Sequence, residues 1–182
     1  ISVISGVINI VATLVAISLI DRVGRRPLLL VGSAGMSVCL VVMAYLFGTA
    51  PLVEVAATST CEAPCMQPTL AGASATLALI AANGFVIFFG FSWGPVVWVL
   101  LGEMFPNRIR AIALSVAASA QWIANFVVST SFPPLAAKGL GLAYGLYAFF
   151  AIISFFFVLK IVHETKGRTL ESMDESYATA ST

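Results

Sequence analysis

Long apolar stretches alternate with short polar connections along this chain. Five stretches contain no Asp, Glu, Lys or Arg, at residues 1–20, 27–53, 63–102, 111–137 and 139–159. About twenty apolar residues cross the hydrocarbon core of a bilayer as an α-helix, so each stretch is long enough for one span. The pattern predicts five transmembrane helices and a polar tail, at about 2–20, 28–47, 74–102, 111–132, 140–159 and 160–182.

Glycine and proline mark the connections between these helices. Gly24 permits a sharp bend in the first connection, and Pro27 is well placed at the start of the next helix. The Thr, Ser, Pro and Glu content of residues 48–73 predicts a loop outside the bilayer. Pro133 and Pro134 are expected to end the fourth helix.

The third predicted helix contains an irregular segment at Gly94 and Pro95. Pro95 has no amide hydrogen, so the carbonyl of Phe91 loses its helical partner, and Gly94 lets the backbone bend. Within a membrane such a break is tolerated where neighbouring helices, or water in a cavity, donate a hydrogen bond to the freed carbonyl. The segment therefore predicts either a cavity near Pro95 or a passive proline kink.

Composition narrows the class of protein. Of the 182 residues, 60% are hydrophobic and 9% are charged, whereas a soluble domain carries roughly a quarter charged residues. A soluble enzyme is excluded. A formal net charge of +1 offers no basic surface for phosphates, which excludes nucleic acid as a partner. The predicted class is an all-α, polytopic helical membrane protein whose surroundings are the lipid bilayer.

Basic residues gather on one side of the predicted bundle. Of the nine Lys and Arg residues, Lys138 alone falls in a connection on the opposite side. Short loops retain Lys and Arg on the cytoplasmic side, so the C-terminal tail is predicted to be cytoplasmic and the protein to lie in the cell membrane. The other eight are Arg22, Arg25, Arg26, Arg108, Arg110, Lys160, Lys166 and Arg168. Because Ile1 already lies within an apolar helix, the chain is interpreted as a piece of a longer protein.

Polar side chains within the apolar stretches are candidates for a binding site. Gln121, Asn125 and Ser129 recur at intervals of four and share one face of the fourth helix. Their donors and acceptors suit a neutral, polyhydroxylated ligand, and the indole of Trp98 can stack on a sugar ring. The alternatives are interhelical hydrogen bonding for the amides and simple packing for the indole. Asn9 is better explained as a contact between helices.

Other reactive residue types predict no further chemistry. No ionisable residue lies deep within a predicted helix, so the chain shows no proton relay of its own. Cys61 and Cys65 share the outer loop, where they are either free or joined by a disulfide. The single histidine, His163, is interpreted as a surface residue. Neither a metal nor a cofactor is expected.

Three segments occur in order at the ends of the predicted helices. They are Asp21-Arg22-Val23-Gly24-Arg25-Arg26-Pro27, then Gly94-Pro95-Val96-Val97-Trp98 leading to Glu103-Met104-Phe105-Pro106-Asn107-Arg108-Ile109-Arg110, and then Glu164-Thr165-Lys166-Gly167-Arg168-Thr169-Leu170-Glu171. Together they resemble the sugar porter family of the major facilitator superfamily. The resemblance covers nearly all of the chain, matches helices eight to twelve of a twelve-helix transporter, and is closest to bacterial sugar/proton symporters.

This resemblance implies a site and a gate. In the family, residues at the positions of Phe89, Trp98, Gln121 and Asn125 line the bound sugar, and the break at Gly94 and Pro95 corresponds to a flexible gate region. Cytoplasmic charges form a network that clasps the two six-helix halves when the transporter opens outward. The matching charges here are Asp21, Arg22, Arg25, Arg26, Glu103, Arg110 and Glu164.

The implied function is transport of a monosaccharide, pentose or hexose, by alternating access with a co-transported proton. An uncoupled sugar uniporter and a transporter-like sugar sensor are the alternatives. The chain departs from the family pattern at His163, where proline is usual, and at Gly90, where some members carry a carboxylate. Helices one to seven would be missing, among them the seventh, which supplies half of the family's sugar contacts. The chain alone is therefore not expected to transport.

Overall fold

The computed structural model describes residues 2–55, 65–105 and 108–162 of the chain. Helices account for most of this part, with one pair of short strands. The elements are α1 (Ser2–Val23), α2 (Arg25–Thr49), β1 (Leu52–Val55), β2 (Cys65–Pro68), α3 (Ala73–Phe91), α4 (Val96–Met104), α5 (Arg110–Lys138) and α6 (Leu140–Lys160).

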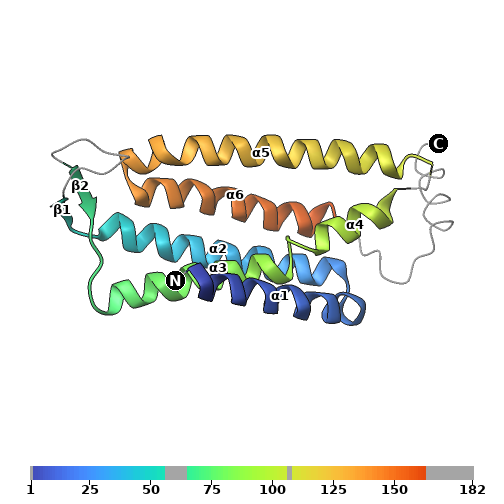
Figure 1. Cartoon of the computed structure of the whole chain (residues 1–182), viewed down its shortest axis with the longest axis horizontal. Helices are drawn as coiled ribbons and strands as arrows, with labels where there is room; N and C mark the ends of the chain where they lie inside the picture. Colours follow the sequence, from blue (N-terminus) through green and yellow to red (C-terminus); the bar gives the residue numbers. More distant parts are fainter. Residues whose placement is uncertain (1, 56–64, 106–107, 163–182) are drawn as a thin grey trace.

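The long helices run side by side along the length of the molecule (Figure 1). The connection between α1 and α2, the end of α4 and the end of α6 share one end of the bundle, while β1 and β2 and the α5–α6 connection share the other. Gly24 turns the chain between α1 and α2 with φ of 103°, a conformation that side-chain-bearing residues rarely adopt. Pro27 falls in the first turn of α2, where its missing amide hydrogen costs no helical hydrogen bond.

The helices have the length and apolar character of membrane spans. Four stretches of the described chain qualify by length and composition: α2, the combined 73–104 stretch, α5 and α6. In α1, Asn9–Ile20 forms a shorter apolar helix. With α3 and α4 taken as one interrupted helix, these elements correspond to the five predicted spans. The prediction of a polytopic helical membrane protein is confirmed.

The connection at residues 48–73 and the fourth helix differ from the prediction. The 48–73 loop contains a two-stranded antiparallel ribbon, in which Leu52 pairs with Pro68 and Val55 with Cys65. Apolar and β-branched residues in Leu52–Val55 favour this extended conformation. The prediction that Pro133 and Pro134 end the fourth helix is wrong, because α5 continues to Lys138. Membrane helices tolerate proline where other groups satisfy the freed carbonyls, and the chain turns instead at Gly139, where φ is 147°.

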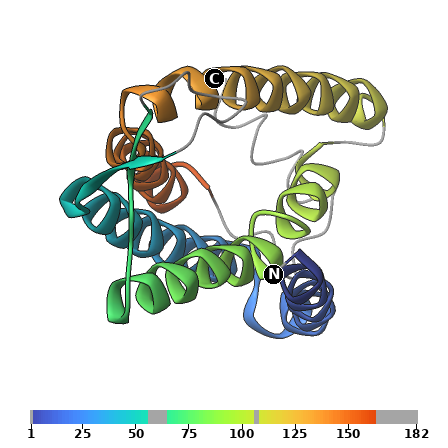
Figure 2. The ribbon, with the colours of Figure 1, turned by 60° about the vertical axis from the view of Figure 1, so that its left-hand side comes forward.

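Helix α2 is the centre of the packing, whereas α5 lies at the edge. α2 packs most extensively against α6 and α3, and α1 packs mainly against α3. α5 packs chiefly against α6 (Figure 2). It has no buried residue. One face of α5 is therefore open to contact from other parts of a larger structure or from lipid.

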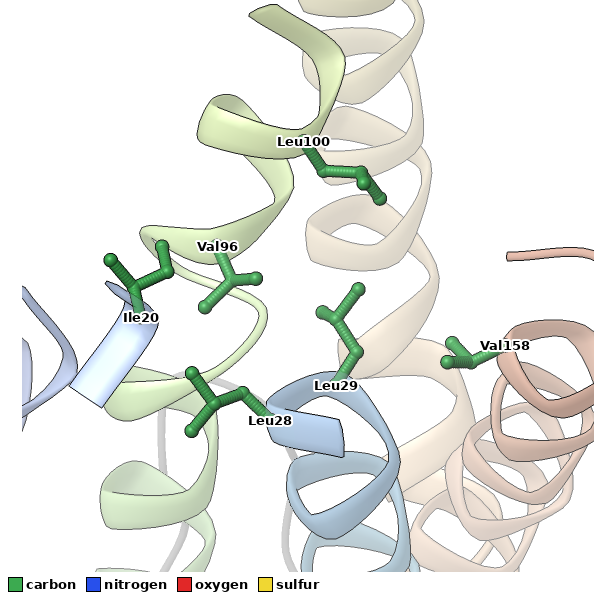
Figure 3. Close-up of a cluster of buried hydrophobic side chains, with 6 residues drawn as sticks. All are labelled: Ile20, Leu28, Leu29, Val96, Leu100 and Val158. Carbon is green, nitrogen blue, oxygen red and sulfur yellow. The ribbon is translucent and has the colours of Figure 1, made fainter. Parts of the chain in front are cut away.

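A hydrophobic cluster packs the helices together at the end of the bundle that carries the α1–α2 connection (Figure 3). It joins the end of α1, the start of α2, both turns of α4 and the end of α6. Val96 and Val158 are completely buried, and Leu29 is 1% exposed. The buried residues of the cluster are Ile20, Leu28, Leu29, Val96, Leu100 and Val158. Their burial fixes the position of α4 after the break in the preceding helix.

Candidate functional site

A cavity of about 740 Å³ lies between α2, α3, α5 and α6. Its volume is in the range of pockets that hold small molecules, about 300–1,000 Å³. Aliphatic and aromatic side chains dominate its wall, with few polar atoms exposed to it. The lining residues are Met36, Leu40, Met43, Ala82, Phe85, Phe89, Trp93, Val128, Tyr144, Tyr147, Phe150, Ala151 and Ser154.

Aromatic residues spaced four apart build the α3 wall of this cavity. Phe85 and Phe89 lie on one face of α3, and their rings stack with centroids 6.4 Å apart. Trp93 continues the same spacing just after the helix ends. Phe89 is 42% exposed, so part of its ring remains open to a ligand. Of the four predicted sugar-binding residues, Phe89 is the one that the structure places in this wall.

Tyrosines of α6 form the opposite wall. The Tyr147 hydroxyl donates a hydrogen bond to the carbonyl of Val128 on α5, at 3.4 Å. The Tyr147 ring stacks with Phe132 at 6.2 Å, and the Tyr144 ring stacks with Phe47 of α2 at 5.4 Å. These contacts tie α5 and α2 to α6 beside the cavity and place aromatic faces with polar edges in its wall.

The break between α3 and α4 lies next to Trp93. Ser92 ends α3, and the amide hydrogens of Ser92 and Gly94 both bond to the carbonyl of Phe89, at 3.2 and 3.0 Å. The helix resumes when the amide of Val96 bonds to the carbonyl of Ser92 at 2.9 Å. Pro95 is the last residue before α4, a position that demands no amide hydrogen. The break is thus stabilised by local backbone bonds beside the aromatic wall.

The other predicted sugar-binding residues lie away from this cavity. Trp98 is on α4 and is 39% exposed. Gln121 and Asn125 are exposed on α5, and neither side chain has a hydrogen-bond partner within the part of the chain that the structure describes. None of the three lines the cavity. Among the described helices, these two amides therefore form no interhelical hydrogen bond, which was the alternative explanation for them.

Charged side chains join four elements at the opposite end from the ribbon. Arg25 of α2 forms an ion pair with Glu103 of α4 at 2.6 Å and also donates to the carbonyl of Ile20 at the end of α1, at 3.1 Å. Arg26 donates to the carbonyl of Leu159 on α6 at 2.7 Å. Through these contacts Arg25 and Arg26 join α2 to α1, α4 and α6.

The remaining network residues are placed as follows. Arg110 donates to the carbonyl of Phe105 at 3.2 Å and closes the turn between α4 and α5. Arg22 is exposed near the end of α1. The side chain of Asp21 and all of Glu164 lie outside the described residues, as do His163 and the predicted alternatives for Cys61 and Cys65.

Trp93, Tyr144 and Tyr147 are site residues that sequence reasoning missed. Trp93 lies in the irregular segment before Pro95. Its spacing of four from Phe89 indicates that the two rings share one face of the helix. The two tyrosines sit in an apolar helix and carry no motif. Their role in the wall depends on how α6 packs against α2 and α5, which the sequence of α6 alone does not specify.

Comparisons with known proteins agree on one family. The model of the family described as "Sugar (and other) transporter" matches residues 1–177. The glucose transport protein of Synechocystis sp. is 58% identical over 174 residues, which cover 95% of this chain and 35% of that protein. The D-xylose-proton symporter of Escherichia coli K12 is 36% identical over 180 residues, which cover 95% of this chain and 32% of that protein.

Solved structures give the same result. The inward open conformation of the xylose transporter XylE from E. coli superimposes with a TM-score of 0.76 at 36% identity, covering 95% of this chain and 34% of that chain. The major facilitator superfamily proton:xylose symporter bound to 6-bromo-6-deoxy-D-glucose gives a TM-score of 0.76 at 34% identity, covering 97% of this chain and 34% of that chain. The chain spans about a third of the length of the curated relatives it matches. These relatives are transporters, which confirms the prediction that the chain is not an enzyme.

Proposed function

Because this chain belongs to the sugar (and other) transporter family, we propose that it forms helices eight to twelve of a transporter that carries a monosaccharide across the cell membrane. Its fold is a partial major facilitator fold. The single observation that carries the proposal is the 58% identity to a glucose transport protein over nearly the whole chain. Glucose is therefore the first substrate to test, and xylose the second.

The geometry supports a sugar path along the open face of α5. Gln121 and Asn125 present unpartnered amides there, and the Trp98 indole on α4 is partly exposed. Amide groups facing lipid are costly, so in the complete protein this face has a polar neighbour or a ligand. Hydroxyl groups of a sugar satisfy amides without needing a countercharge. Phe89 then closes the path from the side of the aromatic cavity.

Transport proceeds in this proposal by alternating access. The two halves rock about the sugar site, and the charges at the α2–α4 end act as a clasp on the cytoplasmic side. Six of the seven Lys and Arg residues in the described part of the chain lie at that end, the exception being Lys138. This distribution supports a cytoplasmic position for the end and for the tail that follows α6.

We further propose that a proton accompanies the sugar. The support is the 36% identity to a D-xylose-proton symporter. Residues 1–20, 27–53, 63–102, 111–137 and 139–159 contain no ionisable Asp, Glu, Lys or Arg, so the group that carries the proton belongs to another part of the complete protein.

Uptake measurements on the complete protein test both steps. Expression in a bacterium that lacks its own glucose and xylose uptake should restore accumulation of radiolabelled glucose, with competition by unlabelled xylose. Addition of sugar to unbuffered cells should make the medium more alkaline if a proton enters with the sugar. Equilibration without accumulation or alkalinisation would indicate a uniporter, and sugar binding without uptake would indicate a sensor. Absence of both binding and uptake for every monosaccharide tested would overturn the proposal.

A further inference from the structure

A partly buried hydrogen bond connects the helix break to α2. The indole Nε1 of Trp93 donates to the hydroxyl of Ser33 at 2.7 Å. Ser33 is completely buried, and Trp93 lines the aromatic cavity. Ser33 shares one face of α2 with Met36 and Leu40, which also line the cavity. The bond therefore joins two walls of the same cavity.

The backbones at this point approach closely because Gly32 has no side chain. A Cβ atom on Gly32 would lie 1.9 Å from the Oγ of Ser92. Ser92 is completely buried, and its hydroxyl donates to the carbonyl of Phe88 on α3. One turn further along α2, a Cβ on Gly35 would lie 2.3 Å from the Phe88 ring. Small residues of this kind let membrane helices pack backbone to backbone.

From this arrangement we infer that Ser33 is a positioning residue, which holds the Trp93 indole in the cavity wall and keeps the end of α3 seated on α2. This inference rests on the proposed function for its meaning in transport. Trp93 lies directly before Gly94, Pro95 and α4, which carries Trp98, so the bond sets the position from which that segment begins.

The chemistry of the pair gives the inference a specific signature. An indole has one donor and no acceptor, so Ser33→Ala leaves the Nε1 hydrogen without its partner in an apolar wall. Trp93→Phe removes the donor itself. Once the donor is gone, the Ser33 hydroxyl has no bond to Trp93 left to lose, so removing it should have little further effect on the contact between the two helices. The two substitutions should therefore be strongly non-additive.

Sugar uptake by the complete protein provides the first readout. Ser33→Ala should raise the KM for the transported sugar about three- to tenfold. Trp93→Phe and the Ser33→Ala/Trp93→Phe double variant should have equal KM values. Ser37→Ala is the matched control, because Ser37 is also buried on α2 but its hydroxyl bonds to the carbonyl of Ser33 in the same helix. It should leave KM unchanged. Additive effects in the double variant, or an equal effect of Ser37→Ala, would overturn the inference.

Modification of Cys39 provides a second readout that needs no sugar. Cys39 is buried on α2, and its Sγ would lie 3.1 Å from a Cβ on Gly84 of α3. If Ser33 keeps α3 on α2, Ser33→Ala should raise the rate of Cys39 modification by N-ethylmaleimide about threefold or more, measured by mass spectrometry of the complete protein. An unchanged rate would overturn the inference. Parent protein without uptake would count against the proposed function alone, since this labelling result stands independently. Should Ser33→Ala fail to fold, the same labelling comparison between Trp93→Phe and the double variant decides, and unequal rates overturn the inference.

Discussion

Arg25 and Glu103 form an ion pair of 2.6 Å that joins the start of α2 to the last turn of α4. Their side chains are 11% and 33% exposed, so the pair lies at the margin of the bundle, partly shielded from water. The hydrophobic cluster around Val96 and Leu100 packs α4 against the same part of α2. A polar contact and an apolar contact thus fix the position of α4 from two directions.

Glu103→Gln should shift the complete transporter toward inward-open states. In the proposed clasp Glu103 helps to hold the two halves together on the cytoplasmic side in outward-open states. The substitution removes its charge, and with it the attraction to Arg25, but keeps the shape of the side chain. A partly exposed ion pair contributes a modest free energy, so the ratio of states should change about two- to fivefold. The measurement is the labelling rate of a cysteine engineered into the cytoplasmic face of the sugar path.

Lys138→Gln is the control for this change. It changes the net charge by one unit, in the opposite direction, at the opposite end of the bundle, where Lys138 is exposed in the last turn of α5. Its labelling rate should match that of the parent protein. An unchanged rate in Glu103→Gln, or an equal change in both variants, would contradict a gating role for the Arg25–Glu103 pair.

Gln121→Ala should weaken sugar binding without affecting membrane insertion. The amide lies on the open face of α5, so its removal should raise the KM about three- to tenfold by deleting hydrogen bonds to the sugar. Ser119→Ala is the control, because the exposed Ser119 hydroxyl already bonds to the carbonyl of Ser115 in its own helix. Uptake kinetics and the amount of protein in the membrane should be measured together. Equal KM values in the two variants would count against the sugar path along α5.

Two substitutions of Trp98 separate stacking from hydrogen bonding. Trp98→Phe keeps an aromatic face and should raise the KM about threefold, whereas Trp98→Ala removes the face and should raise it about tenfold or more. The partial exposure of Trp98 makes both changes tolerable for folding. Initial uptake rates over a range of sugar concentrations provide the test. Identical KM values for the two variants would show that the indole does not stack on the sugar.

Local patterns were enough to predict the helices. Runs without charge place the spans, and the Gly94–Pro95 segment lies where α3 gives way to α4. The prediction from Pro133 and Pro134 was wrong because membrane helices tolerate proline, whereas α5 ends where Gly139 reverses the chain. The strands at Leu52–Val55 and Cys65–Pro68 form only because they pair with each other across a loop. The sequence of either segment alone does not indicate this pairing.

The site was only partly predictable because it is made by packing between helices. Phe89 and Trp93 share a face of the same segment, and their spacing alone would have grouped them. The partner of Trp93 is sixty residues away on α2, and no pattern around Ser33 indicates that contact. Gln121 and Asn125 show the reverse case. Their spacing predicts a shared face, and both side chains are exposed on α5, so their contacts depend on parts of the complete protein beyond these helices.

Gly32→Ala should destabilise the protein through the contact between α2 and the helix break. The new Cβ would meet the side chain of Ser92 at 1.9 Å, so the two backbones must separate. Forcing extra volume into a packed contact costs about 1–3 kcal/mol, which exceeds the gain of about 0.5–1 kcal/mol from replacing glycine by alanine in a helix. The midpoint of thermal unfolding in detergent should fall by several degrees.

Two further variants test whether the clash at Ser92 is the cause. Gly48→Ala lies on the same helix and has nothing within 4 Å of the added Cβ, so it should leave the midpoint unchanged or raise it slightly. Adding Ser92→Gly to Gly32→Ala removes both clashing atoms and leaves the Phe88 carbonyl oxygen as a tight contact at 3.2 Å. The midpoint should therefore recover in part, since the bond from the Ser92 hydroxyl to that carbonyl is also lost. A drop of equal size in Gly48→Ala, or no recovery in the double variant, would show that close packing at Gly32 does not set the α2–α3 contact.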